Sequence, residues 1–345
     1  MAKVRVLHCC NVLDLGGEKS ILVHAKYADK SKFEVFVCGR VQGGRRVAEF
    51  QKQGIPVYIA PQSIDELLKE LSIDIYHVWR SGDYEPGSLP RQKPKSLKIV
   101  ETNIFNAVDH GENHLINCHL FPSEFCKQKY LRTYGAFHGK RYETLYHPID
   151  FEEFPWQPKP FQATFGRVSR SDDQKWHDIC VKIIPKVFQK VPEAQCLIMG
   201  ATEKKLVLMR SLGVLERVQL CENSLDVASF YRRLDVFTHG SRVGETFGCV
   251  IAEAMANRLP VVTISTPQRK KSNAQAELVE HNVTGFVCRF TWQYADAVIE
   301  LLENHTLRER FAERGYEKAR DQFEAAQLTR KLEALYTELM DMGNA

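Results

Sequence analysis

The sequence lacks the features that mark several protein classes. No apolar stretch approaches the 18 residues that a membrane-spanning helix needs, and the first residues enter a strand-like run without the apolar core of a signal peptide. The ten cysteines form no paired Cys-x-x-Cys sets, which argues against a zinc site and favours buried thiols in a reducing cytoplasm. The net charge of +4 is small, and no RNP-like, zinc-finger or helix-turn-helix pattern occurs, so we expect no nucleic acid partner.

Common cofactor-binding patterns are missing as well. There is no Gly-x-Gly-x-x-Gly fingerprint, which disfavours a dinucleotide oxidoreductase, and no Gly-Lys-Ser/Thr of a P-loop. No Asp-x-Asp ends a strand-like run in a setting suited to a metal ion. We therefore expect neither a metal nor a cofactor. We also expect the protein to be cytoplasmic, where it could work at the inner face of a membrane. The oligomeric state is not set by the sequence.

The chain of 345 residues is long enough for two domains. Strand-like apolar runs alternate with helical patterns from end to end, which predicts parallel α/β architecture. Prolines are dense between 147 and 160, so we place a linker there and predict domains at 1–150 and 151–324. A leucine stripe predicts a last helix near 325–345, a segment that could pack back on the first domain.

The segment Gly244-Glu245-Thr246-Phe247-Gly248 is the most informative part of the chain. It follows a short apolar run and opens an apolar helix, and a helix start suits a phosphate. Glu253 lies about 9 Å beyond Phe247 along such a helix, which would put it near the ribose of a bound diphosphate. Glu245 would then face the group on the other side of the phosphates. Alternatively, Glu245 is an ordinary first-turn acid and Glu253 a solvated helix residue.

A second candidate is the basic turn that opens the second domain. Arg167 ends a predicted strand, and Lys175 stands just before a helix predicted over Trp176–Lys190. Arginine binds phosphate bidentately and lysine adds a compact charge, so the two cations suit a diphosphate. Arg170 is a possible third cation. The alternative is a solvated basic turn whose charges pair with the two neighbouring aspartates.

In the first domain the candidate is the turn Leu15-Gly16-Gly17-Glu18, which follows the first predicted strand. Two glycines before a helix let backbone approach a ligand closely, although glycine at such turns is often only structural. Three histidines near strand ends or in the linker are weaker candidates. His77 and His147 are more typical of structural positions, whereas His239 ends the strand that leads to Glu245.

These motifs carry a family resemblance. Gly16-Gly17-Glu18, Gly166-Arg167 with Lys175, and Glu245-x7-Glu253 occur in the order and at separations similar to those of retaining GT-B glycosyltransferases of family 4, the glycosyl transferases group 1. The resemblance extends over nearly the whole chain. It implies an α/β fold of two Rossmann-like, doubly wound domains facing a central cleft, with the acceptor on the N-terminal side and a nucleotide sugar on the C-terminal side.

The resemblance also implies a role for each motif. Glu245 would contact hydroxyls of the donor sugar, and Glu253 would hold the ribose. The remaining donor contacts would come from the cations Arg167 and Lys175 on the diphosphate, from the amides of Thr246, Phe247 and Gly248 on phosphate, and from Gly16 and Gly17 on the phosphates or the acceptor.

Two departures from the family pattern concern the candidate catalytic set of Glu245, Arg167, Lys175 and Asn103. Asn103 stands where many members have a histidine, and it can form hydrogen bonds but cannot titrate. The separation between arginine and lysine is also slightly longer than usual, which leaves open whether Arg167 or Arg170 meets the diphosphate.

The resulting hypothesis is a retaining, metal-independent glycosyltransferase. It would move a sugar from a nucleotide-diphosphate donor, with UDP weakly favoured, to an unidentified saccharide, lipid-linked glycan or small molecule. The alternatives are a nucleotide-sugar epimerase or hydrolase on the same fold, and a non-catalytic protein that binds sugar nucleotides. The basic loop from Arg80 to Ser96 could touch an anionic lipid surface, but a solvated loop is the commoner case.

Overall fold

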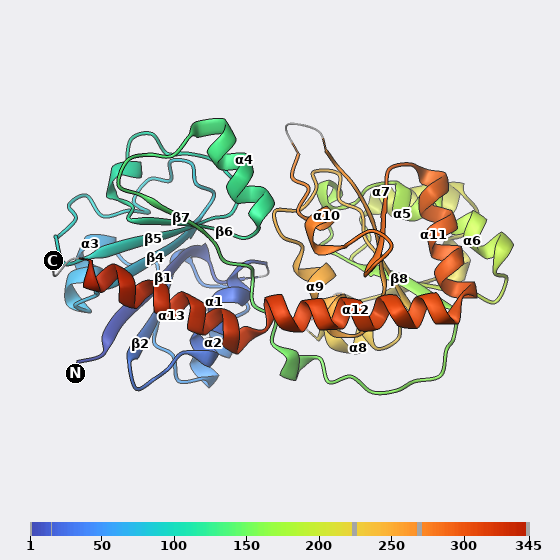
Figure 1. The fold of residues 1–345 in the computed structure, drawn as a ribbon, viewed down its shortest axis with the longest axis horizontal. Helices are drawn as coiled ribbons and strands as arrows, with labels where there is room; N and C mark the ends of the chain where they lie inside the picture. Colours follow the sequence, from blue (N-terminus) through green and yellow to red (C-terminus); the bar gives the residue numbers. More distant parts are fainter. Residues whose placement is uncertain (1, 15, 223–225, 268–270, 343–345) are drawn as a thin grey trace. The chain divides into compact units, whose positions relative to one another are not determined.

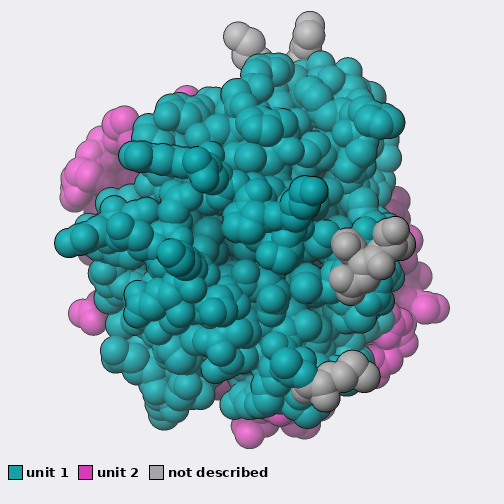
Figure 2. Space-filling view, turned by 90° about the vertical axis from the view of Figure 1, so that its left-hand side faces the viewer, with its two compact units in different colours: residues 1–148, 324–345 teal, residues 149–323 magenta. Residues whose placement is uncertain are grey.

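The computed structural model describes residues 2–14, 16–222, 226–267 and 271–342, which fold into two compact units (Figures 1 and 2). Unit 1 comprises Met1–Pro148 and Glu324–Ala345, and unit 2 comprises Ile149–Phe323. Each unit is built around its own parallel sheet and is described by itself. Leu15 and the last residues of the predicted C-terminal segment, 343–345, lie outside the described residues.

Unit 1 contains a seven-stranded parallel sheet in the order β3-β2-β1-β4-β5-β6-β7. The chain moves outward from β1 to β3, returns to place β4 beside β1, and then moves outward in the other direction. The order therefore reverses between β1 and β4, which is the topological switch point of a doubly wound sheet. The strands are β1 (Val4–Val12), β2 (Phe33–Gln42), β3 (Val57–Ile59), β4 (Ile75–Arg80), β5 (Lys98–Asn103), β6 (Cys118–Phe121) and β7 (Arg141–Thr144).

Helices surround this sheet, and two of them begin at a serine cap. Ser63 and Ser123 have extended backbones, and their hydroxyls accept the amide of the residue three positions later. The cap satisfies one amide that the first helical turn leaves without a partner. The helices of unit 1 are α1 (Glu18–Tyr27), α2 (Val47–Lys52), α3 (Ile64–Glu70), the 3₁₀ turn η1 (Asn113–Leu115), α4 (Glu124–Tyr134) and α13 (Ala325–Asp341).

Unit 2 contains a six-stranded parallel sheet in the order β10-β9-β8-β11-β12-β13. Its order reverses between β8 and β11, so this sheet is doubly wound as well, and ligand sites of such sheets lie beyond the carboxyl ends of the strands at that point. The strands are β8 (Thr164–Val168), β9 (Gln195–Met199), β10 (Val218–Cys221), β11 (Val236–Thr238), β12 (Val261–Ile264) and β13 (Gly285–Cys288).

The helices of unit 2 differ from the sequence-based expectation in several places. The helix predicted over Trp176–Lys190 is wrong: its first residues are not helical, and the rest is split at Ile183, ahead of Pro185. The long helix at 305–323 is not among the predicted ones. The helical elements are η2 (Phe151–Glu153), η3 (Asp173–Lys175), α5 (Ile179–Lys182), α6 (Ile184–Lys190), α7 (Glu203–Ser211), η4 (Leu215–Arg217), α8 (Val227–Tyr231), α9 (Cys249–Ala256), α10 (Gln275–Leu278), α11 (Thr291–Glu303) and α12 (His305–Phe323).

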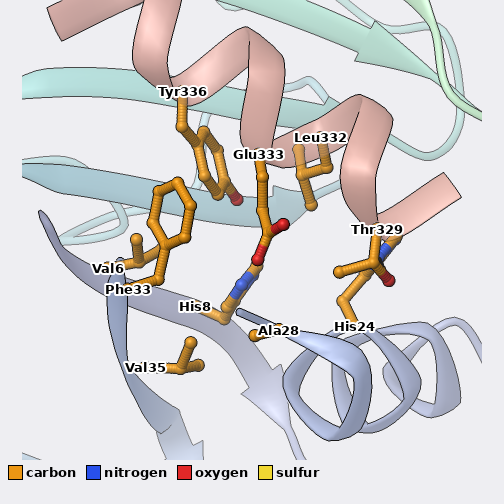
Figure 3. Close-up of a pocket in the computed structure, with 10 residues that line it drawn as sticks. All are labelled: Val6, His8, His24, Ala28, Phe33, Val35, Thr329, Leu332, Glu333 and Tyr336. Carbon is orange, nitrogen blue, oxygen red and sulfur yellow. Dashed lines mark hydrogen bonds between the residues drawn. The ribbon is translucent and has the colours of Figure 1, made fainter. Parts of the chain in front are cut away.

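The C-terminal helix α13 completes unit 1. Its leucine stripe at 328, 332, 335 and 339 is buried against residues of β1, β4, β5 and β6 in one apolar cluster. A cavity of about 10 Å³, the room that one water needs, lies between α13, α1 and the first two strands. Figure 3 shows Glu333 extending from α13 toward His8 at this cavity. Residues far apart in sequence therefore form one core.

Four buried histidines of unit 1 gather around Trp79. The indole Nε1 donates to His8 Nδ1 at 3.2 Å, which requires that nitrogen to be unprotonated. His77 bonds Tyr336 of α13 at 2.6 Å and Thr102 at 2.7 Å. Burial lowers the pKa of His8 to about 3. Burial also lowers the pKa of His147 to about 4, and it lowers the pKa values of His24 and His77.

Acidification should weaken unit 1, because the folded state resists protonation at these four imidazoles. Below the ordinary pKa of 6.5 the unfolded chain takes up protons that the folded chain does not, down to the folded values near 4 and 3. Each histidine then removes about 1.4 kcal/mol from the free energy of unfolding per pH unit. Urea unfolding of the wild type between about pH 7.5 and about pH 5 measures this slope.

Two variants provide the comparison for this slope. His147→Gln should reduce this slope by the contribution of one histidine, about 1.4 kcal/mol per pH unit. His138→Gln, which changes an exposed histidine of the same unit, should leave it unaltered. An identical slope in wild type and His147→Gln would contradict the prediction.

Candidate functional site

The carboxyl end of β8 and the turn η3 bring Arg167 and Lys175 together. Arg167 is 2% exposed, and its guanidinium donates to the Lys175 carbonyl oxygen and, at 3.3 Å, to Cys180 Sγ. It also lies 4.2 Å from the centre of the Trp176 ring, while its buried Nε has no hydrogen-bond partner among the described residues. Buried polar groups are nearly always hydrogen-bonded, so this Nε–H is a candidate hydrogen-bond donor to a ligand atom.

The second arginine of this turn, Arg170, is placed differently from Arg167. Arg170 is exposed, and the aspartates of the turn do not neutralise either arginine by an ion pair among the described residues. Asp173 instead pairs with Lys204 at 2.8 Å. The structure therefore joins Arg167, and not Arg170, to the surroundings of Lys175.

Glu245 is the centre of the site in unit 2. Its Oε2 accepts a hydrogen bond from Lys175 Nζ at 2.7 Å, and its Oε1 lies 3.4 Å from His239 Nε2. Burial alone would raise the pKa of Glu245, but the charge of Lys175 and the hydrogen bond of His239 outweigh it, and the pKa is lowered to about 2. Glu245 is therefore a buried carboxylate that stays ionised at neutral pH.

His239 ends β11 in the position from which it orients Glu245. Its Nδ1 is 2.9 Å from Thr263 Oγ1 of β12, so both ring nitrogens have partners. Burial lowers its pKa, which keeps the imidazole neutral at neutral pH although the Glu245 charge acts in the opposite direction. His239 is thus the one of the three candidate histidines that lies within this site. His77 and His147 belong to the buried cluster of unit 1.

The backbone of the Glu245 loop is fixed by residues that sequence reasoning missed. The amide of Glu245 donates to Gln275 Oε1 at 3.0 Å, and the Glu245 carbonyl accepts the amide of Ala274 at 2.9 Å. Gln275 in turn donates to Thr266 Oγ1 at 2.8 Å. No sequence signal connects residue 275 with residue 245, because only the folding of α10 against β12 brings them together.

Glu253 and its partner Tyr231 link α9 to α8. The Tyr231 hydroxyl donates to Glu253 Oε2 at 3.0 Å, and both residues are buried. Glu253 is therefore not a solvated helix residue. Between the two glutamates, the helix start is formed by Gly248 at a φ of 110°, with Thr246 half-buried and Phe247 packed against Phe323 at a ring distance of 5.2 Å.

The candidate residues of unit 1 form a separate group. Gly16 has a φ of 130°, a conformation that favours glycine, and Gly17 is the N-terminal cap of α1. Asn103 is fully buried: its amide donates to Glu101 and Ala107, and its Oδ1 accepts the amide of Asn106. These bonds hold the loop after β5, and the catalytic role of Asn103 stays a prediction.

Buried charges next to Asn103 contact the same loop. Arg80 donates to Glu101 at 2.6 Å and to Asp109 at 3.1 Å, and Glu101 also accepts a bond from His119 at 2.6 Å. All four groups are buried, and their bonds connect β4, β5 and β6 with the loop that contains Asp109.

The basic loop between Arg80 and Ser96 is partly used by the protein itself. Lys93 Nζ donates to the carbonyl of Leu115 at 2.6 Å and to Asn117 Oδ1, and burial lowers its pKa to about 8. This lysine holds the neighbouring loop instead of facing solvent. Among the described residues, no helix combines the length and the apolar character needed to cross a membrane. The same residues contain no cluster of three or more His, Cys, Asp and Glu side chains suited to a metal ion.

Comparisons with known proteins identify the family. Residues 149–318 match the family described as glycosyl transferases group 1. The phosphatidyl-myo-inositol mannosyltransferase of Mycobacterium leprae (strain TN) is 27% identical over 151 residues, which are 43% of this chain and 39% of that protein. The aligned part thus spans well under half the length of this relative.

Solved structures are similar over nearly the whole chain. They include a glycosyltransferase from Rickettsia africae ESF-5 (TM-score 0.79, 17% identity, 99% of both chains). HepE from Anabaena, in complex with UDP and glucose, covers 97% of this chain and 100% of its own (TM-score 0.74, 16% identity). The sucrose-phosphate synthase of Thermosynechococcus elongatus covers 98% and 100% (TM-score 0.75, 13% identity). At these identities the similarity concerns the fold.

The two doubly wound sheets and the family match of the second unit indicate the same class of protein. The chain has the GT-B fold, as the sequence predicted, and its residues 149–318 match the glycosyl transferases group 1.

Gly244 provides a structural test of the loop that presents Glu245. It has a φ of 73°, and a Cβ atom there would lie 1.7 Å from the Ser272 carbonyl oxygen. Gly244→Ala should therefore lower the free energy of unfolding by roughly 1–3 kcal/mol more than a matched glycine change, because backbone must move. The matched control is Gly213→Ala, at a φ of 68° with nothing within 4 Å. Denaturant unfolding of both variants measures the difference, and equal losses would contradict the packing argument.

Proposed function

We propose that the chain is a retaining glycosyltransferase that takes a nucleotide-diphosphate sugar as donor. The observation that carries this proposal is the buried, ionised Glu245, which Lys175 holds at 2.7 Å at the start of α9. A sugar hydroxyl is a hydrogen-bond donor that an ionised carboxylate accepts, and a diphosphate is the anion that the lysine and a helix start attract. Both halves of the donor can thus be bound at neighbouring points.

Different residues of the site would contact different parts of the donor. Lys175 and the backbone at Thr246–Gly248 would contact the diphosphate, and Arg167 would fix the turn that carries Lys175 while offering its buried Nε. Glu253, fixed by Tyr231, would accept the ribose hydroxyls. Gly16 and Gly17 of unit 1 remain candidates for contacts with the phosphates or the acceptor. HepE, whose fold this chain shares, forms a complex with UDP and glucose, which supports a UDP-sugar as donor.

The chemistry that these groups support is substitution with retention. The acceptor hydroxyl attacks the anomeric carbon from the face on which the diphosphate leaves, and the departing phosphate oxygen takes the hydroxyl proton. One C–O bond forms, one breaks, and the configuration is unchanged. The protein then contributes by positioning the reactants and stabilising the charge on the diphosphate, for which Lys175 and the helix start are placed. The acceptor is a saccharide, a lipid-linked glycan or a small molecule.

The donor site is tested by its lysine. UDP should raise the melting temperature of the wild type, because a ligand of the folded state stabilises it by mass action. Lys175→Met should weaken UDP binding by about tenfold or more and abolish transfer, since it removes a charge-assisted bond to phosphate. Titration calorimetry measures the affinity, and Lys182→Met, an exposed lysine of α5, is the matched control.

Product analysis completes this test. Transfer should give a glycoside only when an acceptor is present, whereas an epimerase or hydrolase would convert the donor without one. Unchanged transfer by Lys175→Met would show that the proposed donor site is wrong.

We further propose that transfer needs no divalent metal, because protein cations neutralise the diphosphate. Activity measured with excess EDTA should then equal activity with added magnesium or manganese. The control is a transfer assay of the same preparation without chelator. Complete loss of turnover in EDTA that either metal restores would refute this part of the proposal.

A further inference from the structure

An open pocket of about 380 Å³ borders the loops that carry Lys175 and Glu245. Asp173 and Gln174 of η3 form one wall, Arg242 and Val243 form a second, and Lys271 contributes a third. All five residues belong to unit 2. The roles proposed above for Lys175, Glu245 and Glu253 do not use this pocket.

The walls of the pocket are fixed by backbone hydrogen bonds. The Arg242 amide donates to the Gln174 carbonyl at 2.9 Å, which ties the turn before Glu245 to the turn that carries Lys175. The Ser272 amide donates to the Val243 carbonyl at 3.0 Å, which ties the third wall to the second. The pocket is therefore a built extension of the Lys175–Glu245 site.

Two acidic groups near the pocket pair with lysines, while Asp172 Oδ1 accepts the Gln174 amide at 2.9 Å. Asp173 accepts bonds from Thr202 at 2.6 Å and from Lys204 at 2.8 Å, and the Lys204 bond is the main cause of its lowered pKa. Asp178 pairs with Lys205. By contrast, the Arg242 guanidinium forms no hydrogen bond or ion pair with the residues that the structure describes.

Two cations, Arg242 and Lys271, thus line the pocket, and their charges act on the neighbouring His177. Burial lowers the pKa of His177; the Asp178 charge opposes this, and the charges of Lys271 and Arg242 lower it further. An arginine without an acidic partner beside a lysine matches a planar oxyanion, because the guanidinium can donate two parallel bonds. The Gln174 side chain, exposed on the facing wall, can add a neutral donor.

We propose that this pocket binds an oxyanion, a carboxylate or a phosphate, carried by the substrate that meets Lys175 and Glu245. The assignment rests on the function proposed above and narrows it to an acidic substrate. The anion belongs either to an acidic donor sugar, such as a uronic acid, or to a phosphorylated acceptor. Arg242 is then a specificity-determining residue.

The experiment compares charged and neutral probes in two arms. The donor arm measures the dissociation constants of UDP-glucuronate and UDP-glucose by calorimetry. The acceptor arm measures those of glucose 6-phosphate and glucose, with and without saturating UDP. The wild type should prefer the charged member of one pair by about fivefold, the scale of an exposed charge pair. That preference should vanish in Arg242→Gln and persist in Arg210→Gln, which changes an exposed arginine of α7.

Each outcome has a distinct meaning. A preference that Arg242→Gln abolishes supports the pocket, and the arm in which it occurs identifies the source of the anion. Equal affinity for charged and neutral probes in both arms, or a preference that Arg242→Gln retains, overturns the proposal. If no nucleotide binds while glucose 6-phosphate keeps an Arg242-dependent preference, the donor site is wrong and the oxyanion pocket stands.

Discussion

The ion pair between Lys175 and Glu245 is the interaction on which the candidate site depends. A carboxylate that is 9% exposed would ordinarily be neutralised by burial, and the adjacent lysine together with His239 reverses that effect. The pair also connects two loops that leave different strands, β8 and β11, at the point where the strand order reverses. The carboxyl edge of unit 2 thereby carries a preformed ion pair.

The rest of the site follows from this pair. Its loop needs glycine at 244 because Ser272 closes over it, and it needs Gln275 because the Glu245 amide would otherwise be buried without an acceptor. The charges of the outer pocket depend on the same loops, since Arg242 lies three residues before Glu245 and its amide binds the residue before Lys175. The proposal of a nucleotide sugar together with an acidic group on the donor sugar or the acceptor rests on this distribution of charge.

Sequence patterns predicted the strands of both sheets better than the helices of unit 2. Apolar runs such as Ile75–Trp79 become central strands because both faces of a parallel sheet are buried. The helix α12 escaped prediction because its buried stripe contains Arg308, Ala312, Gly315 and Ala319, which give little apolar periodicity. Gly315 faces Met255 of α9, where a Cβ would make an ordinary contact at 3.6 Å.

The sequence by itself determined the two doubly wound units, the family and the identity of the residues at the strand ends, because spacing along the chain fixes which residues follow which strand. Only the tertiary structure decided how those residues are used. It bonded Asn103 to the backbone of a buried loop, placed Arg167 under the Lys175 turn, and supplied Tyr231 and Gln275 as partners. The physical reason is that hydrogen bonding and burial join segments that are distant in sequence, and no local pattern records which distant groups will satisfy one another.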